Sequence, residues 1–151
     1  MTQILEGAPA PAIDIPAAGG GRAALSGPTV VVFYPKADTP GCTNEALDFT
    51  RLAPDFAALG VTVIGISRDP VKKLDKFREK HGLAVALGSD EDGAVTEAYG
   101  VWVEKMNYGR TYMGIQRATF LVDGAGIVRK VWSKVSVKGH AGAVLAAAAE
   151  L

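Results

Sequence analysis

The chain has 151 residues, of which 48% are hydrophobic and 21% charged, and its formal net charge at pH 7 is zero. This composition is typical of a folded soluble protein, and it lacks the low hydrophobicity of disordered chains and the excess positive charge of many nucleic-acid-binding proteins. A single cysteine, Cys42, excludes a disulfide within the chain. With only His81 and His140 beside it, it also argues against a zinc or iron–sulfur centre.

We expect no segment of this sequence to act as a secretory signal or a membrane anchor. Residues Met1 to Ala10 lack the basic and then apolar pattern of a secretory signal, and acidic Glu6 interrupts them. The longest apolar runs, such as Val30 to Tyr34, are far shorter than the roughly 20 residues needed to span a bilayer. We therefore expect a cytoplasmic protein with no membrane or nucleic-acid partner. At this length one hydrophobic core suffices, so we expect a single domain over residues 1–151.

The first half of the chain predicts a parallel β-α-β unit. Its first 27 residues are rich in proline, alanine and glycine, which predicts short extended pieces, with residues 19–21 as a turn between short strands. The runs Thr29–Tyr34 and Val61–Ser67 are almost entirely apolar or β-branched and predict buried strands. Between them, residues 43–59 carry apolar side chains at helical spacing, and Pro54 is expected to break or kink that helix.

The second half predicts another helix, an antiparallel hairpin and a closing helix. Asp69 is expected to cap the next helix, with Pro70 at its first position and Gly82 at its end. The remaining elements are a short strand at Ala84–Leu87, a helical turn at Ala94–Tyr99, strands at Ala118–Val122 and Ile127–Ser133 around an Asp-Gly-Ala-Gly turn, and a helix from His140 to Leu151. This order predicts an α/β thioredoxin-like fold, in which helices flank a central mixed β-sheet on both faces.

The only cysteine lies where α/β folds place functional residues, in a loop that leaves a buried strand and enters a helix. Unpaired backbone N–H groups and the positive end of the helix dipole favour the reactive thiolate at such a position. The alternative is a small buried core residue, since free cysteines are often buried. Against it, the preceding Thr39-Pro40-Gly41 offers a hydroxyl, a rigid turn and close approach of the backbone, which a core cysteine does not require.

The residues around Cys42 resemble the active site of the peroxiredoxins. Pro35, Thr39 and Cys42 stand in the pattern Pro-x-x-x-Thr-x-x-Cys. The longer strings Tyr-Pro-Lys at 34–36 and Thr-Pro-Gly-Cys-Thr at 39–43 are similar to the bacterioferritin comigratory protein or PrxQ branch of that family. The similarity extends over nearly everything after the first strand, including Tyr-Met-Gly-Ile at 112–115, which is followed by Arg117.

This resemblance implies a thiol peroxidase that reduces hydrogen peroxide and organic hydroperoxides without a metal or an organic cofactor. By position, Cys42 is implied to be the peroxidatic cysteine, and Thr39 to bond the peroxide through its hydroxyl. Pro35 is implied to shield the site from water, and Arg117 to stabilise the thiolate and the developing charge. Gly41 is also implied to be a substrate-binding residue, together with Thr39, Cys42 and Arg117. Glu45 either orients Arg117 or acts as an anion near the helix start, and both roles stay open.

The sequence departs from this branch at the position five residues after the peroxidatic cysteine. Many members carry a second, resolving cysteine there, but this chain has Leu47, and the helix over residues 71–81 also lacks a cysteine. We therefore expect an external thiol to reduce the Cys42 sulfenic acid, with thioredoxin, glutaredoxin with glutathione, or another small thiol as candidates. A transient disulfide between two Cys42 residues is a further candidate, and overoxidation is a corresponding risk. The resemblance favours a monomer and leaves a dimer open.

Two other functions are compatible with one reactive cysteine. A peroxide sensor or holdase would use oxidation of Cys42 to change a binding surface. A thiol–disulfide oxidoreductase is disfavoured, because it requires Cys-x-x-Cys and position 45 is Glu. The aromatic residues Trp102, Tyr108 and Tyr112 either line the approach to the site or, as is commoner, contribute to aromatic packing.

Overall fold

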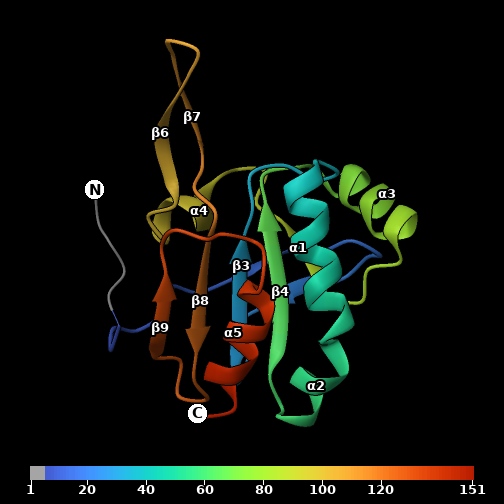
Figure 1. Cartoon of the computed structure of the whole chain (residues 1–151), viewed down its shortest axis with the longest axis vertical. Coiled ribbons are helices and arrows are strands. Elements are labelled where there is room, and N and C mark those ends of the chain that lie inside the picture. Colours follow the sequence, from blue (N-terminus) through green and yellow to red (C-terminus); the bar gives the residue numbers. More distant parts are fainter. Residues whose placement is uncertain (1–5) are drawn as a thin grey trace.

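The fold is built around a five-stranded mixed sheet in the order β5-β4-β3-β8-β9 (Figure 1). The structure is a computed structural model that describes residues 6–151. The strands are β3 (Thr29–Phe33), β4 (Thr62–Ser67), β5 (Ala86–Ser89), β8 (Ala118–Val122) and β9 (Val128–Trp132). The first three run parallel, whereas β8 pairs antiparallel with β3 and with β9. The predicted mixed sheet is therefore confirmed, and both residue runs predicted as buried strands lie at its centre.

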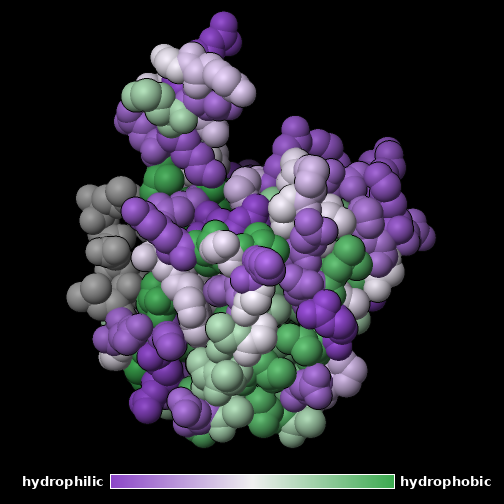
Figure 2. Space-filling view, in the orientation of Figure 1, coloured by the Kyte–Doolittle hydropathy of each residue, from purple (hydrophilic) through white to green (hydrophobic). Residues whose placement is uncertain are grey.

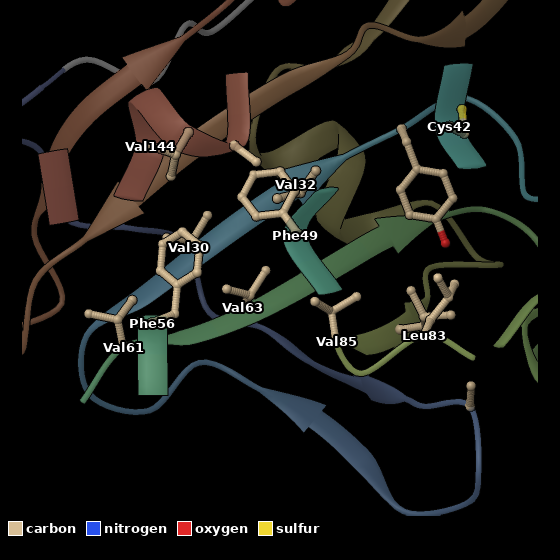
Figure 3. Close-up of a cluster of buried hydrophobic side chains, with 14 of the residues drawn as sticks. Val30, Val32, Cys42, Phe49, Phe56, Val61, Val63, Leu83, Val85 and Val144 are labelled. Atoms are coloured by element: carbon tan, nitrogen blue, oxygen red, sulfur yellow. The ribbon is translucent and has the colours of Figure 1, made fainter. Parts of the chain in front are cut away.

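One face of the sheet is covered by four helices. These are α1 (Pro40–Arg51), α2 (Ala53–Ala58), α3 (Val71–His81) and α5 (His140–Ala148). Alternate strand residues such as Val30, Val32 and Val63 point into this layer and meet Phe49 of α1 and Phe56 of α2 (Figure 3). All of these side chains are buried, as expected for the inner face of a covered sheet.

The opposite face is covered mainly by strands. A short antiparallel pair, β1 (Asp14–Pro16) and β2 (Arg22–Ala24), packs there together with the single helix α4 (Ala94–Ala98). Residues 19–21 form the turn between β1 and β2, and all three glycines have positive φ, so this predicted turn is confirmed. The sheet thus has helices on both faces, as predicted, although the second face has only one short one.

A hairpin that the sequence analysis did not predict extends beyond the body of the molecule. Its strands are β6 (Trp102–Asn107) and β7 (Arg110–Ile115), which pair only with each other. The two-residue turn Tyr108-Gly109 has positive φ at both positions, which is the geometry of a tight hairpin turn. In Figure 1 this hairpin stands at the same end of the sheet as the start of α1.

Several predicted boundaries were wrong. Asp69 does not cap α3, because Pro70 occupies the N-cap position and the Asp69 carboxylate bonds elsewhere. The strand predicted at Ala84–Leu87 is β5, which begins and ends two residues later, and the closing helix ends at Ala148. Gly82 does end α3, in a left-handed conformation, as predicted.

The long helix predicted over residues 43–59 is two helices. α1 begins earlier than predicted, at Pro40. The helical segment is interrupted at Leu52, two residues before Pro54. No helix among residues 6–151 is long and apolar enough to cross a membrane. No secretory signal was expected in residues 1–10, and residues 1–5 of that segment lie outside the described residues.

Candidate active site

Cys42 lies in the first turn of α1, at the edge of the buried cluster on the helical face (Figure 3). The residue is only 3% exposed, so burial alone agrees with the core alternative. Its sulfur, however, accepts a hydrogen bond from Nη2 of Arg117 at 3.2 Å. A guanidinium aimed at a buried sulfur stabilises a thiolate and has no role beside an apolar core cysteine. The surroundings of Cys42 therefore favour the chemical interpretation.

Arg117 reaches this sulfur from the segment between β7 and β8. Its Nη1 donates to Oε1 of Glu45 at 2.7 Å, so one guanidinium joins a carboxylate and a sulfur, both from α1. Gly41 makes room for this arrangement, because a Cβ at that position would lie 3.3 Å from Nη2 of Arg117. Glu45 lies beyond the first turn and contacts Arg117, so of its two open roles the geometry favours orienting the arginine.

Burial and charge act in opposite directions on this pair. Burial raises the pKa of Glu45 above its ordinary value, and the Arg117 guanidinium offsets part of that increase. Burial would lower the pKa of Arg117, but the Glu45 carboxylate and the Cys42 sulfur outweigh it, so the pKa of Arg117 is raised. Arg117 is therefore a permanent cation at the sulfur.

Thr39 occupies the N-cap position of α1 without capping the helix through its side chain. Its hydroxyl instead donates to the backbone oxygen of Lys36 at 2.8 Å. A hydroxyl has one proton and two lone pairs, so this bond uses the donor and leaves the lone pairs to accept a bond from another group. The amino end of α1 thus has no side-chain cap, and its first N–H groups are available to a ligand.

Two carboxylates outside the predicted site hold the loop before Thr39. Asp69 accepts the backbone N–H of Ala37 at 2.7 Å. Asp38 has a left-handed backbone with φ 63°, and its carboxylate accepts Nζ of Lys80 and contacts Nε2 of His81, each at 2.9 Å. The loop is therefore tied to both ends of α3, a connection that sequence reasoning missed because its partners are more than thirty residues apart.

The remaining predicted residues are less directly involved. Pro35 is half-buried between β3 and this loop. Trp102 packs against the guanidinium of Arg68, whose Cζ lies 3.4 Å from the ring centroid. For Tyr108, the expectation that it contributes to aromatic packing was wrong, because its side chain is 98% exposed at the hairpin turn. Within residues 6–151, no group of three or more His, Cys, Asp or Glu side chains is placed to hold a metal ion.

Comparison with known proteins agrees with this geometry. The model of the AhpC/TSA family matches residues 7–131. Peroxiredoxin Bcp of Xanthomonas campestris pv. campestris is 45% identical over 153 aligned positions, which cover 97% of this chain and 96% of that protein.

Two solved structures have the same fold. The Xanthomonas campestris bacterioferritin comigratory protein, studied for alkyl peroxide reduction, has a TM-score of 0.85 and 44% identity, covering 90% of this chain and 89% of that one. A PrxQ mutant of Xylella fastidiosa has a TM-score of 0.90 and 33% identity, with coverages of 97% and 96%. These matches confirm the thioredoxin-like α/β class that was predicted from the sequence.

Proposed function

The chain belongs to the AhpC/TSA family and is a thiol-dependent peroxidase of the peroxiredoxin type, and from this premise we propose that Cys42 attacks the peroxide. The observation that carries the assignment is the 3.2 Å contact between the Cys42 sulfur and the Arg117 guanidinium. The sensor or holdase alternative is not favoured, because the relatives are named peroxiredoxins.

In the oxidation step, the Cys42 thiolate attacks the terminal oxygen of the peroxide. An S–O bond forms and the O–O bond breaks, so that the sulfur is oxidised to a sulfenic acid. The leaving oxygen takes the electron pair, gains a proton and departs as water or an alcohol. Negative charge moves from the sulfur to the leaving oxygen during this step, and stabilising groups must lie along that path.

The neighbours of Cys42 are suited to that movement of charge. Arg117, held by Glu45, presents a fixed cation to the sulfur and to the oxygen that approaches it. The Thr39 hydroxyl, which donates to Lys36, accepts the peroxide O–H. The uncapped N–H groups at Gly41 and Cys42 donate to the peroxide oxygens. Pro35 limits the access of water to the same loop.

We assign the reduction of the sulfenic acid to a thiol from outside the chain. Cys42 is the only cysteine, and the position five residues later holds Leu47, a partly exposed apolar residue. The first external thiolate displaces hydroxide from Cys42 and forms a mixed disulfide, and a second thiolate attacks the reductant's sulfur and releases Cys42. We also propose that the chain acts as a monomer, the state that its resemblance to the PrxQ branch favours. As for the Xanthomonas campestris protein, alkyl hydroperoxides are proposed substrates beside hydrogen peroxide.

Peroxide consumption with thioredoxin, glutaredoxin with glutathione, and dithiothreitol tests this proposal. The Cys42→Ser variant should lose all turnover with every reductant. Thr39→Val keeps the shape of the side chain but removes the hydroxyl, and should slow oxidation of Cys42 by about 10- to 100-fold. Thr43→Val, which removes a hydroxyl one turn into α1, is the matched control. Its rate of Cys42 oxidation should stay within about threefold of the wild-type rate. Full turnover in the serine variant would end the proposal.

A further inference from the structure

One face of the projecting hairpin carries a lysine. In the β6–β7 register, Val103 faces Gly114 and Lys105 faces Tyr112, so these four residues share one side of the hairpin. Trp102 and Glu104 alternate to the other side. Of the four, only Lys105 carries a charge.

Gly114 sets the direction in which Lys105 extends. A Cβ at position 114 would lie 3.2 Å from Cδ and 3.5 Å from Cε of Lys105. The lysine stem therefore lies flat against Gly114, two residues closer to the base of the hairpin than its own partner Tyr112. That base leads directly into Arg117, so the stem of Lys105 extends toward the end of the hairpin that is joined to the active site.

The charges agree with this direction. Burial and the Arg117 guanidinium lower the pKa of Lys105, and the Cys42 sulfur acts in the opposite sense. The charges of both groups therefore act on Lys105. Among residues 6–151 it forms no salt bridge, whereas Arg117 is paired with Glu45. Figure 2 shows hydrophilic side chains gathered between the base of the hairpin and the start of α1.

Oxidation of Cys42 changes the charge balance of this site. In the proposed cycle, the attacking Cys42 thiolate and the Glu45 carboxylate oppose the cations of Arg117 and Lys105. The sulfenic acid is neutral, so the first half of the reaction removes one negative charge and leaves a net positive site. An anion is then attracted at the moment when the external thiol must bind.

We propose that Lys105, placed by Gly114, binds the anionic group of the external reductant and selects acidic thiols for the reduction of the Cys42 sulfenic acid. This inference rests on the external-thiol cycle proposed above. The incoming thiolate attacks the Cys42 sulfur, an S–S bond forms as the S–O bond breaks, and the departing hydroxide is protonated to water. Lys105 touches the carboxylate of the thiol and takes no part in the bond changes.

The test oxidises Cys42 with one equivalent of hydrogen peroxide and then follows its reduction by three thiols of different charge. Glutathione is anionic, 2-mercaptoethanol is neutral and cysteamine is cationic. In Lys105→Met, the rate with glutathione should fall about three- to tenfold relative to the rate with 2-mercaptoethanol, and the cysteamine rate should rise relative to it. Lys105→Arg should restore the glutathione preference, and 1 M salt should remove it in the wild type.

Two further variants separate this role from a general effect of the hairpin. Gly114→Ala keeps the lysine but displaces its stem, together with the Tyr112 ring, whose Cε2 would lie 3.3 Å from the new Cβ, and should lose part of the glutathione preference. Arg110→Met removes a cation near the hairpin turn, away from the base, and should leave the preference unchanged.

Equal slowing of all three thiols by Lys105→Met, or no change in their ratios, would overturn the inference while leaving the peroxidase cycle intact. If Cys42 formed no sulfenic acid at all, the proposed function itself would fail. A third outcome also overturns the inference. If Lys105→Met slowed only the oxidation of Cys42 by a hydroperoxide that carries a carboxylate, Lys105 would be assigned to substrate binding.

Discussion

The two sides of the active site are built in different ways. On one side, the loop before Thr39 is fixed by the carboxylates of Asp38 and Asp69, which tie it to both ends of α3. On the other side, the β6–β7 hairpin is joined to the body only at its base, and its outer residues Met106 and Tyr108 are 76% and 98% exposed. In the proposed cycle, the first side orders the groups that meet a small peroxide. The second side is where we propose that the larger external thiol binds.

This contrast separates the demands of the two half-reactions. Attack on peroxide depends on a few groups held within hydrogen-bonding distance of one sulfur, which favours a loop with many polar ties. Reduction by different thiols depends on attraction and access, for which a surface hairpin with few contacts is sufficient. Substitutions on the two sides should therefore affect different steps, by different amounts.

After the loss of Cys42 itself, the largest effect is expected where the two sides meet, at Arg117. Arg117→Ala removes both the bond to the Cys42 sulfur and the partner of buried Glu45. We expect the rate constant for oxidation of Cys42 by hydrogen peroxide to fall about 100- to 1,000-fold, measured by stopped-flow fluorescence. Arg117→Lys should recover only part of it, since an ammonium group does not reproduce the fork of a guanidinium.

Glu45→Gln is the companion to this measurement. It keeps a hydrogen-bond acceptor for Arg117 but removes the charge, so its loss should be smaller than that of Arg117→Ala. A rate in Arg117→Ala within threefold of the wild type would show that the guanidinium does not act on the reacting sulfur.

A smaller effect is expected from the polar tie at Asp38. Asp38→Asn keeps a residue type that tolerates the left-handed backbone but removes the charge bound by Lys80 and His81. Oxidation of Cys42 by peroxide should slow about two- to fivefold because Thr39 is less firmly held. Alkylation of Cys42 by iodoacetamide, which does not use Thr39, should change little.

The pH dependence of this tie follows from the direction of the shift. Hydrogen bonds from His81 and Lys80 lower the pKa of Asp38 below its ordinary value of 3.8. The stabilisation is therefore complete above that ordinary value and is lost as the pH falls through the lower value of the folded protein. The Asp38→Asn effect should therefore be present at pH 5 and above, and should diminish as the pH falls below 3.8. Lys76→Met, an exposed lysine on the same helix, is the control, and a similar loss there would attribute the effect to α3 as a whole.

The strands and the helix around the fixed side of the site were more predictable from the sequence than the hairpin, although the ties of Asp38 and Asp69 were missed. Continuous apolar runs predicted β3 and β4, and Gly82 predicted the end of α3, because these signals are local. The contact of Arg117 with Cys42 joins residues 75 positions apart, so only the family resemblance suggested it. No local pattern encodes such a distance.

The hairpin was missed for a different reason. Its strands expose most of their residues, so they lack the apolar alternation that identifies a half-buried strand. Its turn places Tyr108 in a left-handed conformation, where Asn or Asp is the usual signal. The sequence analysis also missed Lys105, because the direction of its side chain is known only once the strand register and the contact with Gly114 are known.

The smallest effect is expected at that turn. Tyr108 makes almost no contact with the body, and Asn adopts the left-handed backbone at lower cost than Tyr, so Tyr108→Asn should change the free energy of unfolding by no more than about 0.5 kcal/mol, in the stabilising direction. Urea unfolding measures it. Tyr99→Phe is the contrasting control, because it removes a buried hydroxyl that donates to Pro11 at 2.7 Å and should cost about 1 kcal/mol. If Tyr108→Asn instead destabilised the protein by more than 1 kcal/mol, and did so more strongly at high protein concentration, the tip would pack against a second copy and the hairpin would not be the free side of the site.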